Sequence, residues 1–291
     1  MQLGVAFPAN ELGADPGGLR ALAQAVEGMG FSHLCLGDHV LGADVTNRPG
    51  YEAEFPVTTK TFYHEPLTLI AFLSACAPSL GFATSILVLP QRQTALAAKQ
   101  AAEIDVLCGG RLRLGIGIGR YEVEYEALRM DFHSRGRRVE EQVALMRALW
   151  TEESVTFHGR WHDVSEAGIN PLPVQRPIPI WFGGGSRSET ALKRIARLAD
   201  GWFPGSSGFG ELAETRQRLL SHAQEAGRNL STIPMEGRIN VARGNPDQWR
   251  QAYQSWEQAG ATHLSAGAGG SGSVDEHIAA LRRFSEAVRG A

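Results

Sequence analysis

The feature that most constrains the fold is a regular alternation of two patterns along the whole chain. Residues 3–8, LGVAFP, form an apolar run typical of a buried strand. A helix signal follows, because Asp15 can cap a helix that has Pro16 in its first turn, and apolar residues then recur at helical spacing as far as Gly30. This strand–helix unit is the first of a series.

The same unit recurs to the end of the chain. Seven further strands are predicted at residues 33–40, 80–90, 111–119, 178–185, 201–205, 235–242 and 262–268, each followed by a helical pattern. Eight such units in 291 residues predict an α/β protein with one domain, a (β/α)8 TIM barrel spanning residues 1–291, rather than an open doubly wound sheet. Two insertions are expected: a loop of roughly 25 residues after the second strand, and an irregular excursion at residues 152–177 that resembles a short hairpin.

Composition narrows the possible partners. The net charge of -3 and the scattered Lys and Arg residues argue against nucleic acid and against an anionic membrane surface. The start of the chain carries no targeting pattern, and Pro78 breaks the longest apolar stretch, so no membrane span is expected. Cys35, Cys76 and Cys108 lack the spacing of ligands or disulfides and are expected to be buried thiols, which fits a reducing cytoplasm.

Two ionisable residues, Asp38 and His39, end the second predicted strand. In a (β/α)8 barrel the reactive groups gather at the carboxyl ends of the strands, where the loops open on one face. The pair therefore lies where a barrel places its chemistry. The other interpretation is that a carboxylate and an imidazole fasten the long loop that follows.

Metal and nucleophile sites find little support. The first strand is not followed by His-x-His, so the usual ligand pattern of barrel metallohydrolases is missing. His64 and Glu65 could share an ion with the Asp-His pair, but adjacent residues seldom point at one ion. Ser186 follows a glycine run, and Glu189 three residues later makes it a helix cap rather than a nucleophile.

Glycines end two of the predicted strands. Residues 115–119, GIGIG, end the fourth strand, and residues 183–186, GGGS, end the fifth strand and open a helix. Free N–H groups and the helix dipole attract anions at such a start, so a phosphate could bind there. Close packing between strand and helix explains the same glycines without a ligand.

Read together, these segments resemble a known family. GVAFP at the start, GDHV after the second strand, ATSILVLPQRQTALAAKQAAEIDVLCGGRLRLGIGIG, PVQRPIPIWFGGGS and RLADGW follow in the order found in the bacterial-luciferase-like superfamily. More narrowly they resemble its oxidoreductases that use coenzyme F420, a deazaflavin, although members that use flavin mononucleotide (FMN) share the AKQ and GGR segments. The resemblance covers most of residues 1–205, whereas the C-terminal third carries few diagnostic residues.

The resemblance implies a cofactor site. It places Asp38 and His39 against the cofactor ring, with His39 as proton donor or acceptor and Asp38 orienting it or bonding the ring. It also implies a non-proline cis peptide between Ser85 and Ile86 that backs the ring. The contacts implied for the cofactor's side chain and phosphate are Gly117, Gly119, Gly183, Gly184, Gly185 and Ser186.

The sequence says less about the substrate pocket than about the cofactor site. Aromatic residues near the barrel mouth are expected to form a wall or lid of the substrate pocket; these are Tyr51, Phe55, Phe62, Tyr63 and Tyr121. An oligomer contact would explain the same loop. The family's sugar-phosphate dehydrogenases carry an acidic residue directly after the strand-four glycines, where this chain has Arg120, with Glu122 displaced by two. Their substrate is therefore not transferred.

The function expected from the resemblance is hydride transfer between the C5 carbon of coenzyme F420 and a small organic substrate, by a cytoplasmic homodimer or other homo-oligomer. His39 would manage the single proton, since imidazole titrates near neutrality. Two alternatives remain open: an FMN-dependent monooxygenase on the same fold, and a deazaflavin-binding barrel without catalysis. Neither the substrate nor the direction of transfer follows from the sequence.

Overall fold

The computed structural model describes residues 1–291 except 9, 49–56, 186–187, 206–207, 271 and 291. Its parallel strands form one sheet in the order β10-β11-β1-β2-β3-β5-β8-β9, and the short β4 pairs with β5. A parallel bridge between Trp202 and Met235 joins the two ends of this order, so the sheet nearly closes into the predicted barrel. The strands are β1 (Gln2–Ala6), β2 (His33–Leu36), β3 (Gly81–Thr84), β4 (Leu87–Val88), β5 (Leu112–Gly117), β8 (Ile180–Gly183), β9 (Gly201–Phe203), β10 (Glu236–Asn240) and β11 (His263–Gly267).

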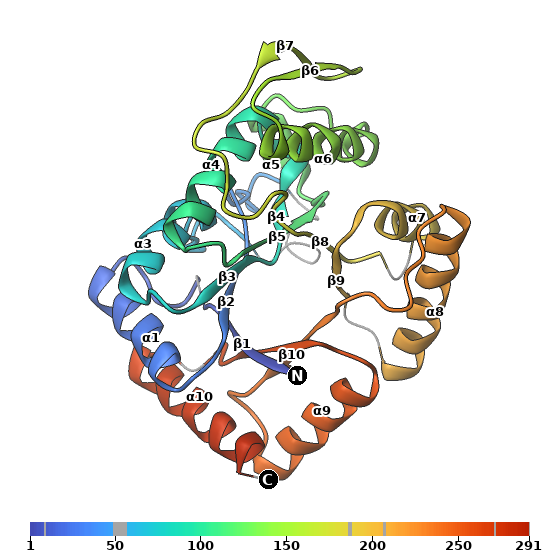
Figure 1. Ribbon diagram of the computed structural model, residues 1–291. Coiled ribbons are helices and arrows are strands. Elements are labelled where there is room, and N and C mark those ends of the chain that lie inside the picture. Colours follow the sequence, from blue (N-terminus) through green and yellow to red (C-terminus); the bar gives the residue numbers. More distant parts are fainter. Residues whose placement is uncertain (9, 49–56, 186–187, 206–207, 271, 291) are drawn as a thin grey trace.

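Helices surround the strands as an outer ring (Figure 1). Their starts follow the sequence signals: the Asp15 side chain accepts from the N–H groups of Gly17 and Gly18, and Ser273 with Glu276 forms a capping box. The helices are α1 (Pro16–Gly28), α3 (Pro66–Cys76), α4 (Thr94–Leu107), α5 (Glu122–Ala127), α6 (Arg135–Thr151), α7 (Glu189–Leu198), α8 (Phe209–Glu225), α9 (Pro246–Gln258) and α10 (Val274–Arg289), with a 3-10 turn η1 (Leu89–Gln91) after β4.

Three local predictions concern a hairpin, a helix cap and a strand. The excursion before the fifth barrel strand does contain a hairpin, β6 (Val155–His158) paired antiparallel with β7 (Asp163–Ala167), which projects from the barrel in Figure 1. The predicted cap of α7 was wrong, because Ser188, not Ser186, accepts from the N–H of Ala191. The third predicted strand is interrupted, since β3 ends before Ser85 and β4 resumes after Ile86.

The core has two parts. The larger part lies between the sheet and the helices and is built from Leu, Ile, Val and Ala side chains together with Trp150 and Trp202. A small second cluster joins Cys35, Trp181 and Phe203 with Ala83. Its members come from four strands, as expected of residues that point into a barrel. Above this cluster the strands end, and the loops build a cavity.

Candidate functional site

A cavity of about 1030 Å³ lies at the carboxyl ends of the strands and extends into the barrel. Its walls come from the turn between β3 and β4, the ends of β5, β8 and β9, and β10. The lining residues are Ser85, Ile86, Gly117, Ile118, Gly119, Arg120, Phe182, Gly183, Gly184, Gly185, Ala191, Arg194, Ile195, Phe203, Pro204, Gly205, Gly208, Glu211, Glu236, Arg238 and Trp256. All five glycines and the Ser85–Ile86 pair of the sequence prediction are therefore brought together in one hollow.

The position of the Ile86 side chain requires glycine at two of those positions. The Ser85–Ile86 bond is cis, as the resemblance implied. The Ile86 side chain lies over the ends of β5 and β8, where a Cβ atom on Gly117 or Gly183 would come within 2.6 Å of its carbon atoms. These two positions are glycine because Ile86 fills the space that a side chain would need.

Gly184 and Gly185 differ in their surroundings. Both have positive φ, 81° and 96°, which favours glycine. A Cβ atom on Gly184 would have nothing within 4 Å, whereas one on Gly185 would lie 2.5 Å from Cδ1 of Ile195. Gly184 is thus an open part of the cavity wall, and Gly185 is a packing position. Ser186, the remaining predicted contact, lies outside the described residues.

The Asp38 carboxylate faces the protein interior. One oxygen accepts from the N–H of Val88 at 2.9 Å, and the other pairs with Arg92 at 2.8 Å. Arg92 also reaches Glu65 at 3.1 Å. Burial raises the pKa of Asp38, and the Arg92 guanidinium opposes that shift. Asp38 thereby ties the end of β2 to β4 and to the start of α4, beside the cavity rather than in its wall.

His39 lies in an aromatic and acidic surrounding. Its Nδ1 is 3.4 Å from Oε1 of Glu124, and its side chain is 22% exposed. The rings of Tyr63 and Tyr121 contact the imidazole edge to face, with centroids 5.0 and 4.8 Å away. The Nδ1 atom is buried without a well-aligned hydrogen bond. The carboxylate that faces His39 in the structure is thus Glu124, and His39, like Asp38, is not among the residues that line the cavity.

Glu124 is a residue that the sequence analysis missed. It is buried on the short helix α5, and its carboxylate accepts from the N–H of Val40 at 2.7 Å and from the side chain of Gln91 at 3.0 Å. Burial alone would raise its pKa, but the contacts from His39, Gln91 and Val40 outweigh burial and lower the pKa. Glu124 therefore stays ionised beside His39. Its distance of 85 positions in the sequence hid the pairing.

The residues predicted to line the substrate pocket lie in different surroundings. Tyr63 is partly buried against His39, and its hydroxyl occupies the space next to Gly37 that a side chain there would need. Tyr121 is 3% exposed, and its hydroxyl accepts from the N–H of Val57, so it supports His39 from the core. Phe62 is 40% exposed and packs on His64. Tyr51 and Phe55 lie outside the described residues.

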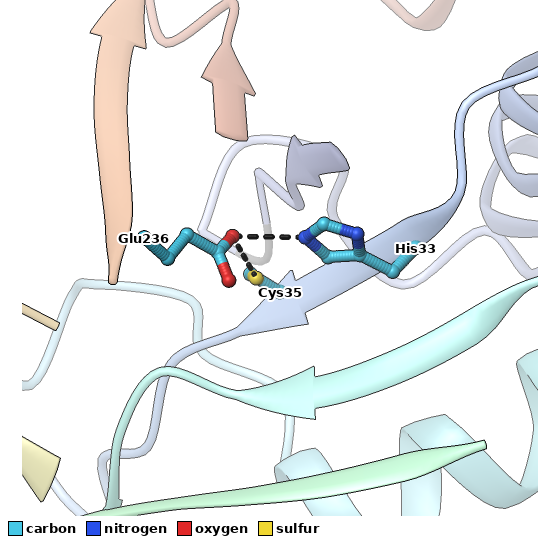
Figure 2. Close-up of side chains that lie close together, drawn as sticks. All are labelled: His33, Cys35 and Glu236. Carbon is cyan, nitrogen blue, oxygen red and sulfur yellow. Dashed lines mark hydrogen bonds and ion pairs between the residues drawn. The ribbon is translucent and has the colours of Figure 1, made fainter. Parts of the chain in front are cut away.

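A second ionisable cluster lies deeper in the barrel (Figure 2). Oε1 of Glu236 lies 2.9 Å from Nε2 of His33 and accepts from the Cys35 thiol at 3.0 Å, and its Oε2 pairs with Arg113 at 2.8 Å. Ser265 donates to the same carboxylate. Burial would raise the pKa of Glu236, but His33 and Arg113 lower it on balance. These donors already satisfy the carboxylate, so the cluster forms a closed polar floor under the cavity.

Two of the three arginines that line the cavity, Arg194 and Arg238, contrast in their partners. Arg194 is paired with Glu140 at 2.9 Å, outside the cavity. Arg238, on β10, donates to the carbonyl oxygen of Ser85 at 2.8 Å and to its hydroxyl. Within the described part of the chain, Arg238 has no carboxylate within 4 Å. No sequence pattern marks Arg238 as a site residue, because β10 lies in the part of the chain that carries few diagnostic residues.

Comparisons with known proteins agree with this fold. A protein of Mycobacterium tuberculosis strain H37Rv, itself uncharacterized, is 35% identical over 220 residues, which are 74% of this chain and 73% of that one. The FMNH2-dependent dimethylsulfone monooxygenase of Pseudomonas putida is 32% identical over 223 residues, 74% of this chain and 57% of that enzyme.

Two solved structures match over nearly their whole length. An F420-dependent secondary alcohol dehydrogenase, solved with an F420-acetone adduct, has a TM-score of 0.79 at 16% identity and covers 99% of both chains. A monooxygenase from Streptomyces bottropensis has a TM-score of 0.78 at 19% identity, over 99% of this chain and 98% of that one. In the described residues no helix is long and apolar enough to cross a membrane. A family model for luciferase-like monooxygenases matches residues 1–287, and the chain belongs to that family.

Proposed function

We propose that this protein is an oxidoreductase that transfers a hydride between coenzyme F420 and a small organic substrate. The observation that carries the proposal is the large cavity at the strand ends, with Gly184 as an open wall and Arg238 in the lining, a cation without a carboxylate partner among the described residues. The likeness to an F420-dependent alcohol dehydrogenase over 99% of both chains supports the choice of a deazaflavin.

The residues present fit such a cofactor. The open wall at Gly184 leaves room for a ligand, and the backbone of residues 183–185 leads into the start of α7, where N–H groups favour an anion. Ser85 and Ile86 are placed where a planar ring can lie against the wall. We assign the phosphate-bearing chain of the cofactor to the glycine side and its ring to the Ser85 side.

The chain's own residues then have defined tasks. When bound, the deazaflavin exchanges two electrons as a hydride at C5. His39 holds or releases the accompanying proton at Nε2, because its Nδ1 faces the ionised Glu124. Glu124 thus orients the imidazole. Asp38 acts as a positioning residue, since its contacts to Val88 and Arg92 hold the segment that follows Ser85 and Ile86.

One observation favours a second candidate, an FMN-dependent monooxygenase. The FMNH2-dependent dimethylsulfone monooxygenase is 32% identical over 74% of this chain, a closer sequence relation than either solved structure offers. Monooxygenation requires a reduced flavin that reacts with oxygen, whereas a reduced deazaflavin reacts poorly with it. The two candidates therefore differ in cofactor and in oxygen dependence.

A binding and turnover experiment separates the candidates. The purified protein is titrated anaerobically with oxidised and reduced F420 and with oxidised and reduced FMN, and F420 absorbance is then followed with a panel of alcohols, carbonyls, enones and imines. We expect micromolar binding of F420, much weaker binding of FMN, and F420 turnover that does not depend on oxygen. Tight binding of reduced FMN with oxygen-dependent turnover would support the monooxygenase instead. Binding of F420 without turnover on any member of the panel would favour a binding protein.

A further inference from the structure

Arg238 projects from β10 into the cavity, on the same strand as the buried Glu236. The guanidinium of Arg238 is exposed there and uses one nitrogen, Nη2, to donate to the carbonyl oxygen and hydroxyl of Ser85. A guanidinium carries five N–H donors in a fixed fork. Its other donors are therefore available to a ligand in the cavity.

The charge of Arg238 is also uncompensated by neighbouring side chains. Glu236 lies two residues earlier on the same strand, but its carboxylate is held by His33 and Arg113. Arg194, the neighbouring cation of the wall, is paired with Glu140. Glu211 lines the cavity from α8 and forms no ion pair with Arg238 in the part of the chain that the structure describes. Arg238 is thus a cation that faces the cavity and lacks a counter-charge within reach.

The position of Arg238 points to the ring of the ligand. Its anchor is Ser85, whose neighbour Ile86 forms the wall between the ends of β5 and β8. The open glycine wall at Gly184 offers the site for a phosphate. The positive charge of Arg238, beside Ser85, therefore interacts with the charge of the ligand's ring rather than with its phosphate-bearing chain.

We infer that Arg238 is a specificity-determining residue that favours a negatively charged ring over a neutral one, which deepens the proposed function and rests on it. The deazaflavin ring of coenzyme F420 carries a phenol-type hydroxyl that ionises and spreads its charge over the ring. FMN has a methyl group in its place, and its oxidised ring is neutral. Arg238 can donate to either ring, but only the anionic ring adds the attraction between two opposite charges, so the arginine distinguishes the two rings.

The test uses two chromophores that share a ribityl chain and lack phosphate: the ribityl deazaflavin from which F420 is built, and riboflavin. Dissociation constants are measured by fluorescence for the native protein, Arg238→Met, Arg238→Lys and Ser85→Ala. We expect the native protein to prefer the deazaflavin. Arg238→Met should reduce that preference by about tenfold or more, and Arg238→Lys should retain most of it. Ser85→Ala keeps the carbonyl oxygen that anchors Arg238, so any change in affinity that it causes should be the same for both chromophores.

Acidity gives an independent readout. Below the pH at which the deazaflavin ring ionises, the native protein should lose its preference, and Arg238→Met should show little pH dependence of the ratio. Equal weakening of both chromophores by Arg238→Met would mean that Arg238 only supports the Ser85 segment and would overturn the inference, as would an unchanged ratio. If the native protein prefers riboflavin but Arg238→Met still weakens deazaflavin binding selectively, the proposed cofactor is wrong and the role of Arg238 stands. Binding of neither chromophore would refute both.

Discussion

Asp38 offers the sharpest test of how the site is built, because the sequence assigned it to the cofactor and the structure places its carboxylate against Val88 and Arg92. Its side chain is 1% exposed, and that of Arg92 is 15% exposed. Asp38→Ala would leave a largely buried guanidinium with only Glu65 and would remove the acceptor of the Val88 N–H. We therefore expect this substitution to act first on stability.

The size of the effect follows from burial. Removing one partner of a buried ion pair costs about 3 to 5 kcal/mol, and the remaining Glu65 contact places this case near the lower end. The unfolding entropy near 60 °C is about 2.1 cal/mol/K per residue, or about 0.6 kcal/mol/K for a chain of 291 residues. The expected fall in melting temperature is therefore about 5 °C, the lower end of the roughly 5 to 8 °C that this range of energies gives.

Thermal unfolding followed by circular dichroism measures this shift, with His39→Ala as the matched comparison. His39 is partly exposed, so its removal should lower the melting temperature by less than about 3 °C. It should nevertheless lower turnover by about 10²- to 10⁴-fold on a substrate that the native protein converts, the scale of a lost general acid or base. In a double-mutant cycle, Arg92→Met should cost much less in the Asp38→Ala background than in the native protein. An Asp38→Ala protein that melts within about 1 °C of native but no longer binds cofactor would refute the structural role.

Two further predictions concern the barrel floor and the glycine wall. Burial, reinforced by the charge of Arg113, lowers the pKa of His263 to about 3 in the folded protein. Between about pH 3 and the unfolded pKa near 6.5, only the unfolded chain binds a proton at this residue. Stability should therefore fall as the pH drops from 7 to 5. Urea unfolding at pH 5, 6 and 7 measures this loss of stability, which should be smaller for His263→Gln than for the native protein. The control His158→Gln, at a side chain that is 65% exposed, should lose as much stability as the native protein. An equal loss in all three proteins would contradict the role given to His263. Gly184→Ala and Gly185→Ala both place a side chain on a backbone with positive φ, but only the Gly185 variant adds a clash, with Ile195. Gly185→Ala should therefore lower the melting temperature more than Gly184→Ala, whereas Gly184→Ala, whose Cβ enters the open cavity, should weaken cofactor affinity more than Gly185→Ala. Isothermal titration and melting of both variants give the comparison, and a reversed order would show that the cavity wall at Gly184 takes no part in binding.

The barrel and the edge that carries the site could be predicted from the local sequence alone. Periodicity and caps such as Asp15 and Ser273 depend on interactions within a few residues, which are written directly in the local sequence. The same local signals placed the glycines after β5 and β8 at the carboxyl ends of the strands, where the cavity lies. The cap at Ser188 was missed because the sequence has two serines, at positions 186 and 188, just before the same helical pattern.

Only the tertiary structure decided which side chains meet. Glu124 faces His39 from 85 positions away, and Glu236 meets His33 from 203 positions away, because strands and loops distant in sequence are neighbours in a closed barrel. Packing also decided direction: β2 ends at Leu36, and the turn beyond it sends the Asp38 carboxylate toward Arg92 instead of toward the cavity. A strand pattern specifies which residues alternate between faces, but the direction of a side chain after the strand depends on the partners that the fold brings to it.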